Sequence, residues 1–107
     1  MADYFVNKGD TTLVPHKLVA GQKNVTTPGT ELQLVTADTN IYSVVIKAKA
    51  ANTGIIYVGG DNTVSSTTGF ALAAGESVSI EIDNLNKIWI DSSVGSEGVT
   101  YLYVTAY

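Results

Sequence analysis

The amino-acid sequence predicts an all-β protein: a single jelly-roll-like antiparallel β-sandwich preceded by an extended N-terminal arm. Apolar and polar residues alternate over short segments, and clusters of Gly, Asp, Asn and Ser separate these segments at roughly ten-residue intervals. No window carries the apolar stripe of an amphipathic helix. We therefore expect the arm in residues 1–22 and the sandwich domain in residues 23–107.

The clearest strand signal lies in residues 77–82. Successive side chains of a strand point to opposite faces, and every second residue of this segment is aliphatic: Val78, Ile80 and Ile82. The turn before it, residues 73–76, contains Gly75 and follows Phe70 and Leu72, which are two residues apart. This arrangement predicts two strands joined by a tight, glycine-containing connection.

The remaining strands are expected before and after this pair in the sequence. Their segments are residues 23–27, 31–36, 41–50, 55–58, 87–91 and 99–107. In the longest, residues 41–50, alternation assigns five residues to one apolar face: Tyr42, Val44, Ile46, Ala48 and Ala50. Val45 is the apolar exception on the opposite, lysine-bearing face. Roughly eight short strands with frequent turns are typical of a sandwich or barrel.

Residues 1–22 lack this regularity. Pro15 has no backbone donor and disfavours a central strand. Apolar residues nevertheless recur: Phe5, Val6, Leu13, Val14, Leu18 and Val19. We interpret the segment as an extended arm that lies on its own domain or on a neighbour. A short edge strand plus a loop is the alternative that the same residues allow.

Composition narrows the function classes. The chain has no long apolar run and no signal-peptide pattern at its start, so we expect a soluble protein made in the cytoplasm, with no membrane partner. It has no cysteine, which excludes disulfides and thiolate-held metals. It also has no arginine and a net charge of −4, which argues against binding nucleic acid.

No residue pattern indicates catalysis or a cofactor. The single histidine, His16, lies beside Pro15 with no nucleophile motif in the chain, so we expect a solvated side chain and no enzyme. Oxygen ligands for calcium do occur in predicted loops: Asp61, Asn62, Asp83, Asn84, Asn86 and Asp91. Their spacing matches no EF-hand, and such residues also favour turns for their own hydrogen bonds.

Aromatic residues with a polar tip are the more informative group. We predict a subunit or partner interface formed by Trp89, Tyr101, Tyr103 and Tyr107. In a regular last strand, these tyrosines alternate with Leu102 and Val104. If the leucine and valine point into the sandwich, the tyrosines point to a partner. The other assignment, in which the tyrosine face is the core side of a sheet, is equally compatible with alternation.

Four segments give the chain a resemblance to a known class of proteins. They are residues 21–27 (GQKNVTT), 52–59 (NTGIIYVG), 68–77 (TGFALAAGES) and 98–104 (GVTYLYV). With these segments, the chain from residue 21 onward resembles small virion proteins of tailed bacteriophages, namely capsid decoration or cement proteins and related head-fibre proteins.

The resemblance implies a structural role without cofactor or active site. Such proteins are compact β domains, often homotrimers, that sit on the outer capsid surface of the virion and hold neighbouring copies of the major capsid protein together. The chain before residue 21 has no counterpart in the resemblance, and we expect the apolar side chains of the arm to contact the capsid: Phe5, Val6, Leu13, Val14 and Leu18. The alternative is a carbohydrate- or receptor-binding module of a tail or head fibre.

Overall fold

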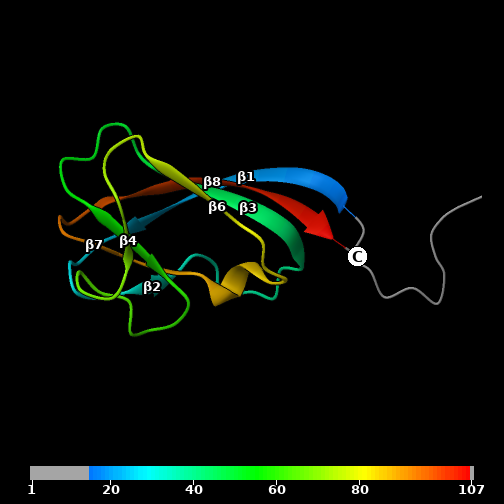
Figure 1. The fold of residues 1–107 in the computed structure, drawn as a ribbon, viewed down its shortest axis with the longest axis horizontal. Coiled ribbons are helices and arrows are strands. Elements are labelled where there is room, and N and C mark those ends of the chain that lie inside the picture. Colours follow the sequence, from blue (N-terminus) through cyan, green and yellow to red (C-terminus); the bar gives the residue numbers. More distant parts are fainter. Residues whose placement is uncertain (1–14, 107) are drawn as a thin grey trace, which may run out of the picture.

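A computed structural model describes residues 15–106, which form two antiparallel sheets of four strands each (Figure 1). One sheet has the order β1-β8-β3-β6 and the other the order β2-β7-β4-β5. The strands are β1 (Pro15–Val25), β2 (Leu32–Gln33), β3 (Ile41–Ala48), β4 (Ile56–Gly59), β5 (Phe70–Leu72), β6 (Ser77–Ile80), β7 (Trp89–Ser92) and β8 (Glu97–Ala106). The all-β, two-sheet prediction is confirmed.

The helical content of residues 15–106 is the single 3₁₀ turn η1 (Leu85–Lys87). Asn84 caps this turn, because its side-chain oxygen accepts a hydrogen bond from the Asn86 amide at 3.1 Å. Within the described part of the chain, no helix has the length and apolar character needed to cross a membrane.

The strand pairing has a simple rule. The first strand pairs with the last, β2 with β7, β3 with β6 and β4 with β5, always antiparallel. The chain therefore folds back on itself around the connection between β4 and β5. Two further pairings, β3 with β8 and β4 with β7, join these hairpin-like pairs into the two sheets.

The core lies between the sheets and consists mainly of aliphatic side chains. Its buried members are Val25, Leu34, Ile41, Val44, Ile46, Ala48, Ile56, Val58, Leu72, Leu85, Ile88, Ile90 and Val99. Val78, Ile80 and Ile82 pack against this cluster, as their alternation predicts. Their burial removes apolar surface from water, which stabilises the fold by about 25 cal/mol for each Å² buried.

The orientation of β8 is the reverse of the one on which the predicted tyrosine interface depends. Tyr101 and Tyr103 pack against the core, whereas Leu102 is 42% exposed on the outer face. The register explains this orientation, because Tyr101 lies opposite Ile46 of β3. Ile46 is fully buried, and residues directly opposite each other share one face of a sheet.

Strand β3 follows the predicted alternation except at its start. Val44, Ile46 and Ala48 are buried as expected, but Tyr42 is exposed and Ile41 is buried in its place. Ala50, also predicted on this face, lies beyond the end of β3 and is exposed. The register with β8 shifts between Ile41 and Ser43. Such an irregularity adds a residue to one strand and inverts the alternation beyond it.

The predicted arm is corrected over residues 15–22, which belong to β1 and pair with β8. The edge-strand alternative therefore holds for this part of the chain. Pro15 is the first residue of an edge strand, where its missing N–H costs no ladder hydrogen bond. Phe5, Val6, Leu13 and Val14 lie outside the described residues.

Candidate interaction surface

The outer face of β1, β8 and β3 carries a row of apolar side chains. Ala20 lies opposite Leu102, and Leu102 lies opposite Val45, so three adjacent strands each contribute one residue. Leu18 extends the row by one step along β1 and lies opposite Val104. We call Leu18, Ala20, Val45 and Leu102 the outer row.

The outer row is accessible to a partner. Leu18 is 63% exposed, Leu102 42% and Val45 39%. Ala20, Val45 and Leu102 also line a shallow hollow of about 370 Å³, together with Lys47 and Thr100. Scattered exposed apolar residues are normal, but a contiguous group on one sheet face indicates a binding surface.

The charges around the outer row are basic. Glu97 is the one acidic residue in β1, β3 and β8, and it is engaged elsewhere. Its carboxylate accepts hydrogen bonds from the backbone N–H groups of Thr53 at 2.7 Å and Gly54 at 2.8 Å. These bonds favour the ionised form and lower the pKa of Glu97. The outer face is therefore apolar and basic, in a chain with a net charge of −4.

Lys49 is fixed at one end of this face. Its ammonium group donates to the side-chain oxygens of Gln22 at 2.7 Å and Asn24 at 2.9 Å. Both residues belong to β1, so these bonds tie the edge strand to the segment that follows β3. Chemically, the surface suits a protein partner that offers apolar side chains and carboxylates, not a small polar substrate.

Of the four aromatic residues predicted as one interface, the structure places Trp89 in a different sheet from Tyr101 and Tyr103. The rings of Tyr101 and Tyr103 stack with centroids 6.0 Å apart on the inner side of β8. Burial, followed by the proximity of Tyr103, raises the pKa of Tyr101. Trp89 is half-buried in β7 of the other sheet, and Tyr107 lies outside the described residues. Their interface role stays a prediction, whereas the outward orientation of Tyr101 and Tyr103 was wrong.

A second, more polar hollow lies against the other sheet. It measures about 390 Å³ and is lined by Tyr57, Asp91, Ser65, Ser66 and four neighbours. The Asp91 carboxylate accepts hydrogen bonds from the backbone N–H groups of Gly29 at 3.0 Å and Ser92 at 2.8 Å. The hollow therefore places an aromatic ring beside serine hydroxyl groups, whereas Asp91 itself is only 4% exposed.

Several of the oxygen-bearing residues that could have bound calcium instead serve local structure. Asp61 accepts hydrogen bonds from Thr63, and Asp83 forms an ion pair with Lys87 at 2.7 Å; these bonds lower the pKa of both carboxyls. Asn84 caps η1. Over residues 15–106, no three His, Cys, Asp or Glu side chains come together as a metal site. His16 lies in β1 at the exposed edge of the sandwich.

Of the outer row, only Leu18 was expected from the sequence to contact the capsid. For the surface that it forms with the other three residues the signal was Val45, an apolar residue on a face that otherwise carries Ser43, Lys47 and Lys49. Comparisons of the chain with family models, curated proteins and solved structures return no match. The fold and these surfaces are therefore the features of the molecule that bear on its function.

Proposed function

We propose that the chain is a structural virion protein, a decoration or cement protein on the outer surface of a tailed-phage head. It binds the major capsid protein through the outer row and stabilises contacts between capsid subunits, without cofactor or catalysis. Copies assemble in the host cytoplasm and associate as homotrimers. The resemblance of residues 21–27, 52–59, 68–77 and 98–104 to such proteins is one source of this proposal.

We further infer that the two sheets form a jelly roll. The supporting observation is the strand order, β1-β8-β3-β6 in one sheet and β2-β7-β4-β5 in the other. These orders arise when a chain folded into one long hairpin is rolled into two layers. Jelly rolls occur in viral capsid proteins and in lectins, so the topology is compatible with both functions considered.

The outer row is the main structural support for the proposed contact with the capsid. Its exposed side chains make a patch of the order of a few hundred Å², the size of the largest apolar patch on a typical monomer, which is often functional. A stable contact buries about 800 Å² on each partner. The outer row would therefore be the apolar centre of a larger interface, with Lys47 near its rim.

A charge-insertion pair tests this proposal. Leu102→Glu places a carboxylate in the centre of the outer row, where a capsid contact would desolvate it. Val94→Glu is the matched control, because Val94 is similarly exposed at 38% but belongs to the loop between β7 and β8. In co-sedimentation with heads that lack the protein, we expect Leu102→Glu to bind at least tenfold more weakly. Equal binding of both variants would overturn the proposed face.

The hollow at Tyr57 and Asp91 favours a second candidate function, a carbohydrate-binding module of a tail or head fibre. Here the tyrosine ring would stack on a sugar, and the hydroxyl groups of Ser65 and Ser66 would exchange hydrogen bonds with the sugar hydroxyls. A glycan array probed with the wild type and Tyr57→Ala tests this function. A glycan signal that Tyr57→Ala removes would support it, and an array without signal would exclude it for the glycans presented.

A further inference from the structure

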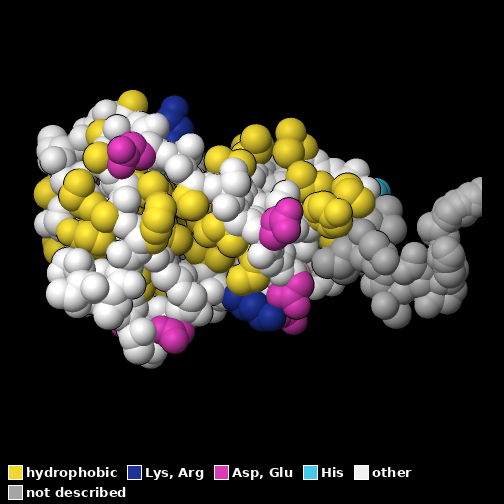
Figure 2. Space-filling view, in the orientation of Figure 1, with side chains coloured by type: hydrophobic (Ala, Val, Ile, Leu, Met, Phe, Trp, Pro, Cys, Tyr) yellow, Lys and Arg dark blue, Asp and Glu magenta, His cyan; other side chains and the backbone are white. Residues whose placement is uncertain are grey.

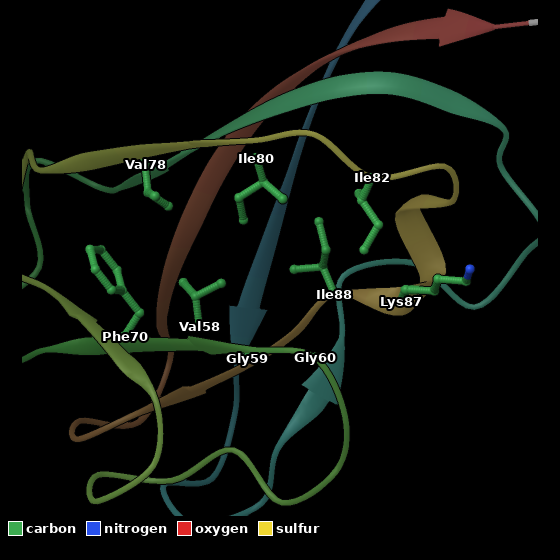
Figure 3. A pocket seen from close by; sticks show the side chains of 9 residues that line it. All are labelled: Val58, Gly59, Gly60, Phe70, Val78, Ile80, Ile82, Lys87 and Ile88. Atoms are coloured by element: carbon green, nitrogen blue, oxygen red, sulfur yellow. The ribbon is translucent and has the colours of Figure 1, made fainter. Parts of the chain in front are cut away.

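An apolar cleft opens along one edge of the sandwich, between β6 and the sheet that contains β4 and β5. It holds about 320 Å³, and six apolar side chains line it: Val58, Phe70, Val78, Ile80, Ile82 and Ile88 (Figure 3). The space-filling view shows hydrophobic side chains gathered across the middle of this face (Figure 2). Phe70, at one end of the cleft, is 59% exposed.

The cleft is bordered by unpaired strand edges. Among the described strands, β6 pairs with β3 alone and β5 with β4 alone, so each ends its sheet. The Ala48 amide donates to the Glu76 carbonyl at 2.9 Å. This bond shows that the backbone groups of Glu76, and of every second residue after it in β6, face β3. Because hydrogen-bonding direction alternates along an antiparallel strand, the backbone groups of Ser77 and Ser79 point toward the open edge.

These two features together suit an extended peptide. A strand added to β6 would hydrogen-bond with Ser77 and Ser79 and turn every second side chain into the cleft. The one charged residue that lines the cleft, Lys87, is already paired with Asp83 at 2.7 Å. The cleft therefore favours apolar side chains over a charged ligand.

The chain itself contains a segment of this kind. Tyr4-Phe5-Val6 is an apolar triplet within the fourteen residues that precede β1. In an added strand, Tyr4 and Val6 would point into the cleft and Phe5 to the outer side, beside Ser79. The ten residues from Phe5 to Pro15 span up to about 33 Å when extended, at about 3.3 Å per residue.

The position of β1 favours the cleft of a neighbouring copy, although the segment is long enough to reach either copy. β1 and β6 are the two opposite edges of one sheet. The segment would have to pass around the full sheet, three strand spacings of about 4.8 Å each, to reach the cleft of its own subunit. A neighbouring copy placed edge to edge offers its β6 directly. Joining opposite edges in this way is a head-to-tail contact, which forms a ring of copies when the rotation between neighbours closes and an open filament when it does not.

We propose that residues 4–6 of one copy add as a strand to β6 of the next copy and fill its apolar cleft, closing a ring of three. This strand exchange goes beyond capsid attachment, because it concerns how the copies hold one another in the absence of a head. The two proposals also fail separately. Leu102→Glu should leave the trimer intact, and loss of strand exchange should be visible in purified protein alone.

Engineered disulfides test the exchange directly, because the chain has no native cysteine. Phe5→Cys combined with Ser79→Cys should form covalent dimers and trimers on mild oxidation, seen on a non-reducing gel. Phe5→Cys combined with Ser66→Cys is the matched control, since Ser66 is also an exposed serine but lies outside the cleft. If the gel shows only monomer bands, whether or not the monomer contains an intramolecular disulfide, the proposal is overturned.

A second measurement uses substitutions outside the described sandwich. Tyr4→Asp with Val6→Asp should convert the trimer to monomer by light scattering at micromolar concentration, with an unchanged circular dichroism spectrum. Tyr4→Phe keeps the apolar ring and should keep the trimer. A wild-type monomer, or a trimer that persists in the double-aspartate variant, would contradict strand exchange.

Discussion

The phenol ring of Tyr101 lies directly over Gly21 of the neighbouring strand. A Cβ atom at residue 21 would come within 2.5 Å of the Tyr101 Cζ atom and 2.6 Å of its hydroxyl oxygen. The two residues are register partners in the β1–β8 pair. The absence of a side chain at Gly21 therefore makes room for the ring on the inner side of the sheet.

This contact predicts that Gly21→Ala destabilises the fold. The added methyl group must displace the Tyr101 ring, and overpacking of this kind costs about 1–3 kcal/mol of unfolding free energy. Gly60→Ala is the matched control, because a Cβ there meets nothing within 4 Å. Urea denaturation of both variants measures the difference. Equal stability of the two variants would contradict the close packing. In a Tyr101→Ala background, which lacks the ring, Gly21→Ala should leave the unfolding free energy nearly unchanged.

The orientation of β8 predicts opposite effects for two adjacent residues. Tyr101→Ala removes a ring that packs against the core and should cost about 1–3 kcal/mol, below the range of about 3–5 kcal/mol for fully buried aromatic residues. Leu102→Ala alters an exposed side chain and should change stability by about 0.5 kcal/mol or less. Thermal melts of the two variants test this order. A larger loss for Leu102→Ala would mean that the strand faces the other way.

Glu97 predicts an acid-dependent loss of stability. Its folded-state pKa is lowered, chiefly by the Thr53 and Gly54 amides, from an ordinary value of 4.5. A lowered pKa stabilises the fold above the unfolded-state value, and this stabilisation is lost as the pH falls through the folded-state value. Denaturation midpoints measured from pH 6 down to about pH 3 should fall less steeply for Glu97→Gln than for the wild type. Parallel curves would exclude this contribution.

Alternation predicted the strands whose two faces differ in polarity. Val78 and Ile80 alternate with serines, so their inward orientation followed from the sequence. Both faces of β8 are apolar, one with Tyr101 and Tyr103 and the other with Leu102, so alternation alone could not orient it. The register with Ile46 and the space over Gly21 decide the orientation. These are tertiary contacts, which a single strand does not encode.

The outer row was hidden for a related reason. Val45, Leu102 and Ala20 come from distant parts of the chain and become one surface only through the pairing of β3, β8 and β1. The register irregularity before Ser43 also exposes Tyr42, which alternation had assigned to the core side. A pattern read along one strand contains neither the pairing nor the irregularity.

The most direct test of the proposed function is the position of this chain in an intact phage particle, determined at residue resolution. We expect the sandwich on the outside of the head, with Leu18, Val45 and Leu102 against the major capsid protein. Contact through the hollow at Tyr57 and Asp91, with the outer row in solvent, would contradict the proposed face. Particles from which the chain is absent would contradict the proposed function itself.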